Sequence, residues 1–137
     1  MEVEIRSWIQ KAARGYYYLA PLWFLAERLF WPGFRSGAFV GRSLLGAAAF
    51  YAAEGALGAA FWRANPWASR LALAENVAYL VAIMRRVLLT PLDVAAALDV
   101  DPDAAQALAG SYQGFLFGVL IAGFQIFAHH YAKRSDG

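Results

Sequence analysis

The segment over residues 104–132 contains no aspartate, glutamate, lysine or arginine. An α-helix rises about 1.5 Å per residue, so about 20 apolar residues cross the hydrocarbon core of a bilayer. Asp101 and Pro102 stand before the segment in the order typical of a helix start, and two basic residues follow it. The sequence therefore predicts a transmembrane helix over residues 104–132.

The composition extends this prediction to the whole chain. Apolar residues make up 61% of the 137 residues and charged residues only 16%, whereas soluble domains have about 45–50% and about 25%. A soluble domain this small needs more polar side chains to cover its large relative surface. We therefore expect one all-α domain, residues 1–137, integral to a membrane, and we assign it to the inner membrane of a prokaryotic cell.

Three further hydrophobic segments are predicted as helices, at about 14–33, 37–62 and 67–89. The first is ambiguous, because its uncharged part is short, is interrupted by Pro21 and ends at Glu27. It either crosses the membrane with a kink or lies in the interface as an aromatic helix. The sequence thus predicts a membrane helical bundle with three to four transmembrane helices.

Helix starts and charges divide the second half of the chain. A capping residue precedes proline at positions 65–66, 90–91 and 101–102. The first of these leaves a short connection between the helices over 37–62 and 67–89, which predicts an antiparallel hairpin. The second, followed by several aspartates, predicts a separate short surface helix at about 91–99.

The distribution of basic residues does not predict which way the bundle is oriented in the membrane. Four crossings place seven of them on one side, and the other five, among them Arg35, on the opposite side. In this count Arg35 is an interfacial charge between the first and second predicted helices.

Two glutamates lie within the predicted hairpin. Glu54 and Glu75 each stand about ten residues from the connection between the helices, which puts both roughly 15 Å from the turn. A carboxylate at this depth is costly unless it is paired, protonated or facing water. Glu54, Glu75 and the neighbouring Asn76 are therefore candidates for an ion or proton pathway.

Three interpretations of the two glutamates stay open. They are neutral and hydrogen-bond across the bundle, they pair with an arginine of another subunit, or they share a proton or cation. If they do not face each other, each needs a donor such as Asn76, Tyr79, Gln113 or an arginine from a neighbouring subunit.

Glycines recur every four residues in the last predicted helix. Gly110, Gly114 and Gly118 share one face, and Gly123 follows one residue out of step. Small residues at this spacing allow two membrane helices to approach closely. They predict tight helix packing, either inside the bundle or against a second copy or another subunit.

The last helix ends with two adjacent histidines, His129 and His130. Neighbouring side chains on a helix point about 100° apart, so these two cannot bind one metal from one face. They are weak candidates for metal or haem ligation, and cysteine is absent. We expect no cofactor, haem and pigment included.

Motifs of known catalytic sites are missing, among them GxSxG, HExxH, the phosphate-binding loop and the dinucleotide fingerprint. The net charge of +2 gives no reason to expect nucleic acid binding. We expect a non-enzymatic accessory or structural subunit of a larger membrane complex, in contact with lipids and with other subunits or copies. The alternatives are a homo-oligomeric channel or transporter using Glu54 and Glu75, and a cofactor subunit using His129 and His130.

Overall fold

The computed structural model describes residues 1–134, and the regular secondary structure of this part of the chain consists of helices, without strands. The prediction of an all-α fold is therefore confirmed. The helices are α1 (Glu2–Tyr18), α2 (Ala20–Leu29), α3 (Gly37–Val40), α4 (Leu44–Trp62), α5 (Ala68–Leu98) and α6 (Pro102–Lys133).

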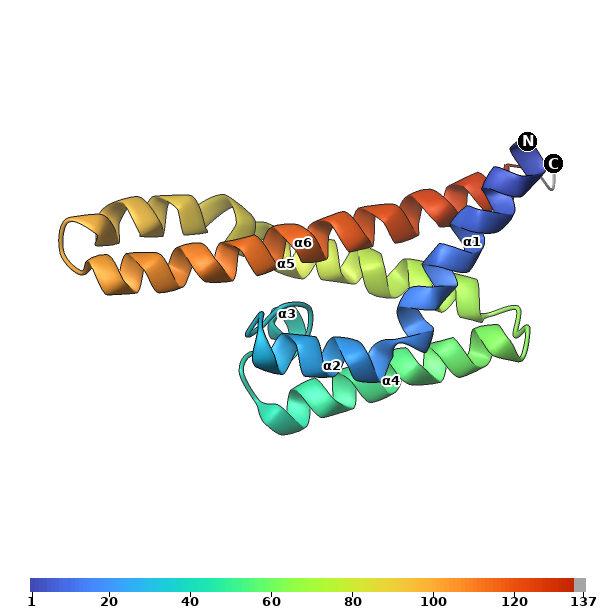
Figure 1. Cartoon of the computed structure of the whole chain (residues 1–137), viewed down its shortest axis with the longest axis horizontal. Helices are drawn as coiled ribbons and strands as arrows, with labels where there is room; N and C mark the ends of the chain where they lie inside the picture. Colours follow the sequence, from blue (N-terminus) through green and yellow to red (C-terminus); the bar gives the residue numbers. More distant parts are fainter. Residues whose placement is uncertain (135–137) are drawn as a thin grey trace.

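A long antiparallel hairpin of α5 and α6 runs the length of the molecule (Figure 1). The other helices pack along one half of it, with α2 antiparallel to α4 and α1 in contact with both α4 and α6. The N-terminus, the end of α6 and the α4–α5 turn lie at one end of the molecule. At the opposite end the hairpin extends beyond the remaining helices.

Two of the three predicted helix starts have the expected chemistry. The Asp101 side chain accepts a hydrogen bond from the Ala104 backbone N–H at 3.1 Å and caps α6. The Asn65 side chain accepts from the Trp67 N–H at 2.9 Å. This turn precedes α5, which begins at Ala68 rather than directly at the proline.

The predicted surface helix at 91–99 is wrong as a separate element, because α5 continues through Pro91 to Leu98. Proline inside a helix removes one backbone hydrogen bond and usually kinks or ends the helix. Here α5 stays paired with α6, and Thr90 and Ala105 are both buried. Tertiary packing outweighs the local signal for a new start.

Two of the other predicted segments are each divided. Residues 14–33 contain the end of α1 and all of α2, which meet at Leu19. Residues 37–62 contain the single turn of α3 and the whole of α4, and Gly41 between them has a φ of 64°. This left-handed conformation favours glycine because it has no side chain.

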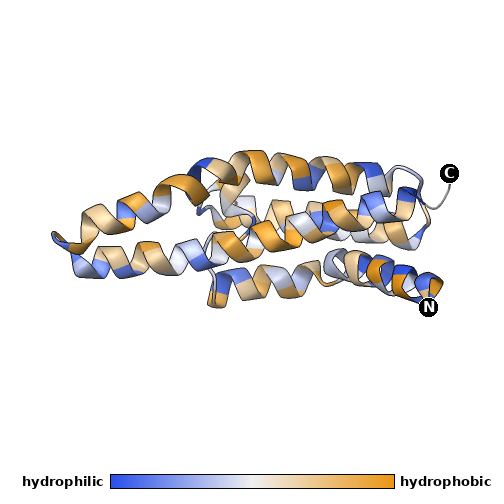
Figure 2. Cartoon of the chain, turned by 90° about the horizontal axis from the view of Figure 1, so that it is seen from above, coloured by the Kyte–Doolittle hydropathy of each residue, from blue (hydrophilic) through white to orange (hydrophobic). Residues whose placement is uncertain are grey.

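Two helices, α4 and α6, are long and apolar enough to cross a membrane. Three or four crossings are not confirmed. In each of these helices, only 22% of an apolar stretch of 18 residues is buried inside the chain. Figure 2 shows hydrophobic residues along the helices, and large apolar side chains such as Leu45, Val81 and Leu120 are exposed. The chain alone therefore leaves a large apolar surface uncovered.

Helix α1 crosses α4 at Gly58. A Cβ atom at this position would lie 2.9 Å from the backbone carbonyl oxygen of Tyr17 and 3.1 Å from its carbonyl carbon. We expect Gly58→Ala to lower the free energy of unfolding by about 1–3 kcal/mol, because the backbone of α1 has to shift. Denaturant unfolding in detergent measures this.

Gly123→Ala is the matched control, since a Cβ atom there would meet nothing within 4 Å. Equal unfolding free energies for the two variants would contradict the close crossing of α1 and α4.

Candidate functional site

The connection between α2 and α3 carries Arg35 into the interior of the bundle. Gly33, with a φ of 79°, turns the chain just before it. The Glu27 Oε1 atom accepts hydrogen bonds from the backbone N–H groups of Arg35 at 2.8 Å and Ser36 at 2.9 Å, and Oε2 accepts from the Ser36 hydroxyl at 2.6 Å. One buried carboxylate of α2 thus fixes the position of this loop.

The Arg35 guanidinium, 0% exposed, lies between α4 and α5. It forms a close ion pair and hydrogen bond with Glu75 and donates from both terminal nitrogens to Asn76 Oδ1 at 3.1 Å. Its Nη2 atom is 3.8 Å from Glu54 Oε1. A single cation therefore joins residues of two helices and a loop.

Tyrosines enclose this group. The guanidinium carbon of Arg35 is 4.5 Å from the ring centre of Tyr79 and 5.1 Å from that of Tyr16, distances at which a cation is attracted to an aromatic face. The Tyr17 hydroxyl donates to Glu75 at 3.3 Å and accepts from the Asn76 amide at 2.8 Å. These contacts add α1 to the site.

We call Glu27, Arg35, Glu54, Glu75 and Asn76 the central cluster. It holds three carboxyl groups and one guanidinium, so ionisation of all of them leaves an excess of negative charge. Both Glu54 oxygens are buried and accept no hydrogen bond of normal geometry from the described residues. The Tyr16 hydroxyl, also buried without such a bond, and the Glu75 carboxyl are close enough to interact with them. Burying an ionised carboxylate without such partners is costly, and the cation near Glu54 is Arg35, at 3.8 Å.

The structure brings together the three residues proposed for an ion or proton pathway, Glu54, Glu75 and Asn76. Of the expected donors, Asn76 and Tyr79 contact Arg35, while Gln113 is exposed and lines a groove away from the cluster. The arginine that contacts both glutamates, Arg35, belongs to the same chain.

Sequence reasoning missed the roles of Arg35 and Glu27. The sequence predicts an interfacial position for Arg35, because it stands between two hydrophobic segments. The available signal is its setting in residues 32–36, Pro-Gly-Phe-Arg-Ser. A tight turn that places an arginine next to a large apolar residue is consistent with a loop folding back into the bundle.

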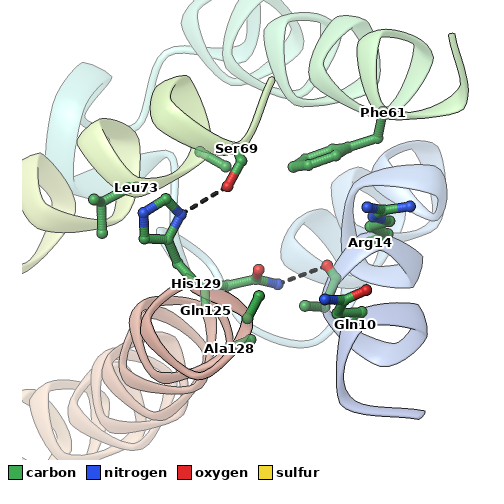
Figure 3. A pocket seen from close by; sticks show the side chains of 11 residues that line it. Gln10, Arg14, Phe61, Ser69, Leu73, Gln125, Ala128 and His129 are labelled. Carbon is green, nitrogen blue, oxygen red and sulfur yellow. Dashed lines mark hydrogen bonds between the residues drawn. The ribbon is translucent and has the colours of Figure 1, made fainter. Parts of the chain in front are cut away.

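One side of the central cluster leads toward a cavity of about 80 Å³ at the end of the molecule that holds the termini. Figure 3 shows Gln10 and Arg14 of α1, Ser69 of α5, and Gln125 and His129 of α6 around it. Ala72 also lines this cavity, and its backbone carbonyl accepts a hydrogen bond from Asn76 at 2.7 Å.

The opposite side leads to a groove of about 800 Å³, whose walls include Glu27 and Ser36. The Glu27 carboxylate accepts a hydrogen bond from the backbone of Arg35, whereas the guanidinium of Arg35 donates to Asn76, so Arg35 stands between the groups that border the two spaces.

The glycines of α6 have different surroundings. A Cβ atom at Gly118 would overlap the Tyr79 hydroxyl and lie 2.9 Å from its ring carbon Cζ, and one at Gly114 would lie 3.7 Å from the Trp31 Cβ. At Gly110 and Gly123 nothing lies within 4 Å. Gly114 and Gly118 thus pack inside the bundle, whereas Gly110 and Gly123 face open space.

The two histidines have separate partners. His129 Nδ1 is 2.7 Å from the Ser69 hydroxyl, as Figure 3 shows, and His130 Nδ1 is 3.0 Å from the Ile126 carbonyl oxygen. Within residues 1–134, groups of three or more histidine, cysteine, aspartate or glutamate side chains suited to a metal ion are absent. Comparison with known proteins found no matching family model, no matching curated protein and no matching solved structure.

Proposed function

We propose that this chain is a non-enzymatic integral membrane protein that transfers protons through the central cluster. The observation that carries the proposal is Glu54, a buried carboxyl group whose oxygens accept no hydrogen bond of normal geometry among the described residues and whose nearest cation, Arg35, is already paired with Glu75. Ionisable groups inside a membrane bundle are costly, and they commonly belong to ion or proton pathways.

The position of Arg35 favours a proton over a metal cation. The guanidinium contacts both Glu54 and Glu75, so a metal ion between these carboxylates would meet a positive charge. A proton binds to a single Glu54 oxygen and needs no such space. The Tyr17 hydroxyl and the Asn76 amide, linked at 2.8 Å, extend the hydrogen bonding toward the small cavity.

The purified chain can be reconstituted in liposomes with a potassium diffusion potential. We expect the pH of the lumen then to change faster than in empty liposomes. A pH-sensitive dye inside the vesicles measures the rate. Glu54→Gln should lower this rate by at least about tenfold, because the amide cannot release a proton to a neighbour at neutral pH.

Glu4→Gln is the control, since Glu4 lies exposed in the first turn of α1 and its loss should leave the rate unchanged. Proton movement equal to that of empty liposomes in the unmodified protein would refute the proposal. Normal movement in the Glu54→Gln, Glu75→Gln double variant would refute it as well.

A second candidate function, an accessory subunit of a membrane complex, is supported by the far end of the α5–α6 hairpin. This end extends past the other helices (Figure 1) and leaves Leu88, Leu92 and Val100 exposed. Purification from the native membrane in mild detergent tests this role. An accessory subunit retains another polypeptide at fixed stoichiometry and shows no flux alone, whereas Leu92→Asp should release that polypeptide.

A further inference from the structure

A wide groove opens beside the connection between α2 and α4, where the α5–α6 hairpin begins to extend past the other helices (Figure 1). The end of α2, the following loop and the start of α4 form one wall, and residues 104–113 of α6 form the other. Its volume of about 800 Å³ is in the range of small-molecule sites. An adjoining hollow of about 290 Å³ shares Arg42 and Ser111 with the groove and reaches α5.

Three arginines line these spaces. Arg28 and Arg42 border the groove, and Arg86 joins Arg42 around the adjoining hollow. None of the three forms an ion pair with a carboxylate in the described part of the chain. The acidic residue in the walls, Glu27, directs both oxygens to the loop at 35–36. The arginines of the groove and the hollow outnumber this one carboxylate, so their walls carry an excess of positive charge.

The groove lies at the level expected for lipid headgroups. Helix α4 has 19 residues, which corresponds to a length of about 28 Å and so to the hydrocarbon core of a bilayer. Arg42 and Ser43 stand just before its first residue, and Trp62 and Arg63 stand at its other end. Tryptophan and arginine at helix ends are typical of the membrane–water interface.

We propose that this groove binds the phosphate group of an anionic phospholipid, through Arg28, Arg42 and Arg86. Guanidinium groups donate paired hydrogen bonds to phosphate oxygens, and basic pockets between membrane helices bind such headgroups. Leu44 and Leu45, which follow Arg42 by two and three positions, are exposed. They offer an apolar surface for the acyl chains below the phosphate.

Native mass spectrometry of the whole protein in mild detergent tests this site. We expect dioleoylphosphatidylglycerol to bind at least about tenfold more tightly than dioleoylphosphatidylcholine. Arg42→Gln should weaken phosphatidylglycerol binding by about tenfold, the loss typical for one charged hydrogen bond. Arg85→Gln is the matched control, because Arg85 is exposed next to Arg86 but lines neither space.

Competition with inorganic phosphate distinguishes a phosphate group that belongs to a lipid from one that belongs to a free phosphate compound. Displacement of phosphatidylglycerol by phosphate shows that free phosphate compounds enter the site, and lack of displacement assigns it to the lipid. Either result supports phosphate recognition.

Equal binding of the two lipids by the unmodified protein would overturn the proposal. So would unchanged phosphatidylglycerol binding when Arg28, Arg42 and Arg86 are all replaced by glutamine. The comparison of the two lipids uses the unmodified chain and does not depend on the folding of any variant.

Discussion

Replacing Arg35 with methionine is expected to lower the free energy of unfolding by about 3–5 kcal/mol, the cost of leaving buried carboxylates without their cation. Arg35 is completely buried and contacts Glu54, Glu75 and Asn76. Methionine fills a similar volume, so loss of charge and hydrogen bonding dominates over loss of packing. Unfolding in detergent, followed by circular dichroism, measures the difference.

Two further variants separate charge from shape. Arg63→Met removes an exposed arginine that forms no ion pair within residues 1–134 and should change stability by less than about 0.5 kcal/mol. Adding Glu54→Gln and Glu75→Gln to Arg35→Met should recover part of the loss, because the uncompensated charges are then gone. Equal stability of Arg35→Met and Arg63→Met would show that the ion pairs do not hold the bundle together.

Replacing Gly118 with leucine is expected to cost about 3 kcal/mol or to prevent folding, the upper range for inserting atoms into a packed core. A side chain at this position would overlap Tyr79, whose ring lies 4.5 Å from the Arg35 guanidinium carbon. The displaced ring would therefore disturb the central cluster. Yield of monodisperse protein in detergent and its unfolding midpoint measure the effect.

Gly123→Leu is the control for this substitution. It lies in the same helix and has open space around the position of its Cβ atom, so it should fold with the stability of the unmodified chain. A Gly118→Leu protein of normal yield and midpoint would contradict the packing of α6 against Tyr79.

The depth of the glutamates could be derived from the sequence because it depends on local geometry alone. Helical rise and a short turn are sufficient to set Glu54 and Glu75 at a similar distance from the connection. The capping of α6 by Asp101 is equally local. Such features follow from residues a few positions apart, and no knowledge of the tertiary arrangement is needed.

Arg35 and Pro91 depend instead on contacts between distant parts of the chain. The position of Arg35 is set by Glu27 and by residues 40 or more positions later. The helix through Pro91 is supported by α6, which begins at Pro102. A charge between hydrophobic segments, or a threonine before a proline, has the same local appearance whether it lies at an interface or inside a bundle.

The proposed transfer of protons and the proposed binding of a phospholipid both require the exposed apolar faces of α4 and α6 to be covered by lipid. Fractionation of cells that express the chain, with alkaline carbonate washing of the membranes, tests this requirement most directly. We expect the protein to stay in the membrane pellet and to enter solution only with detergent. Recovery of the unmodified chain as a monodisperse species in buffer without detergent would contradict the account.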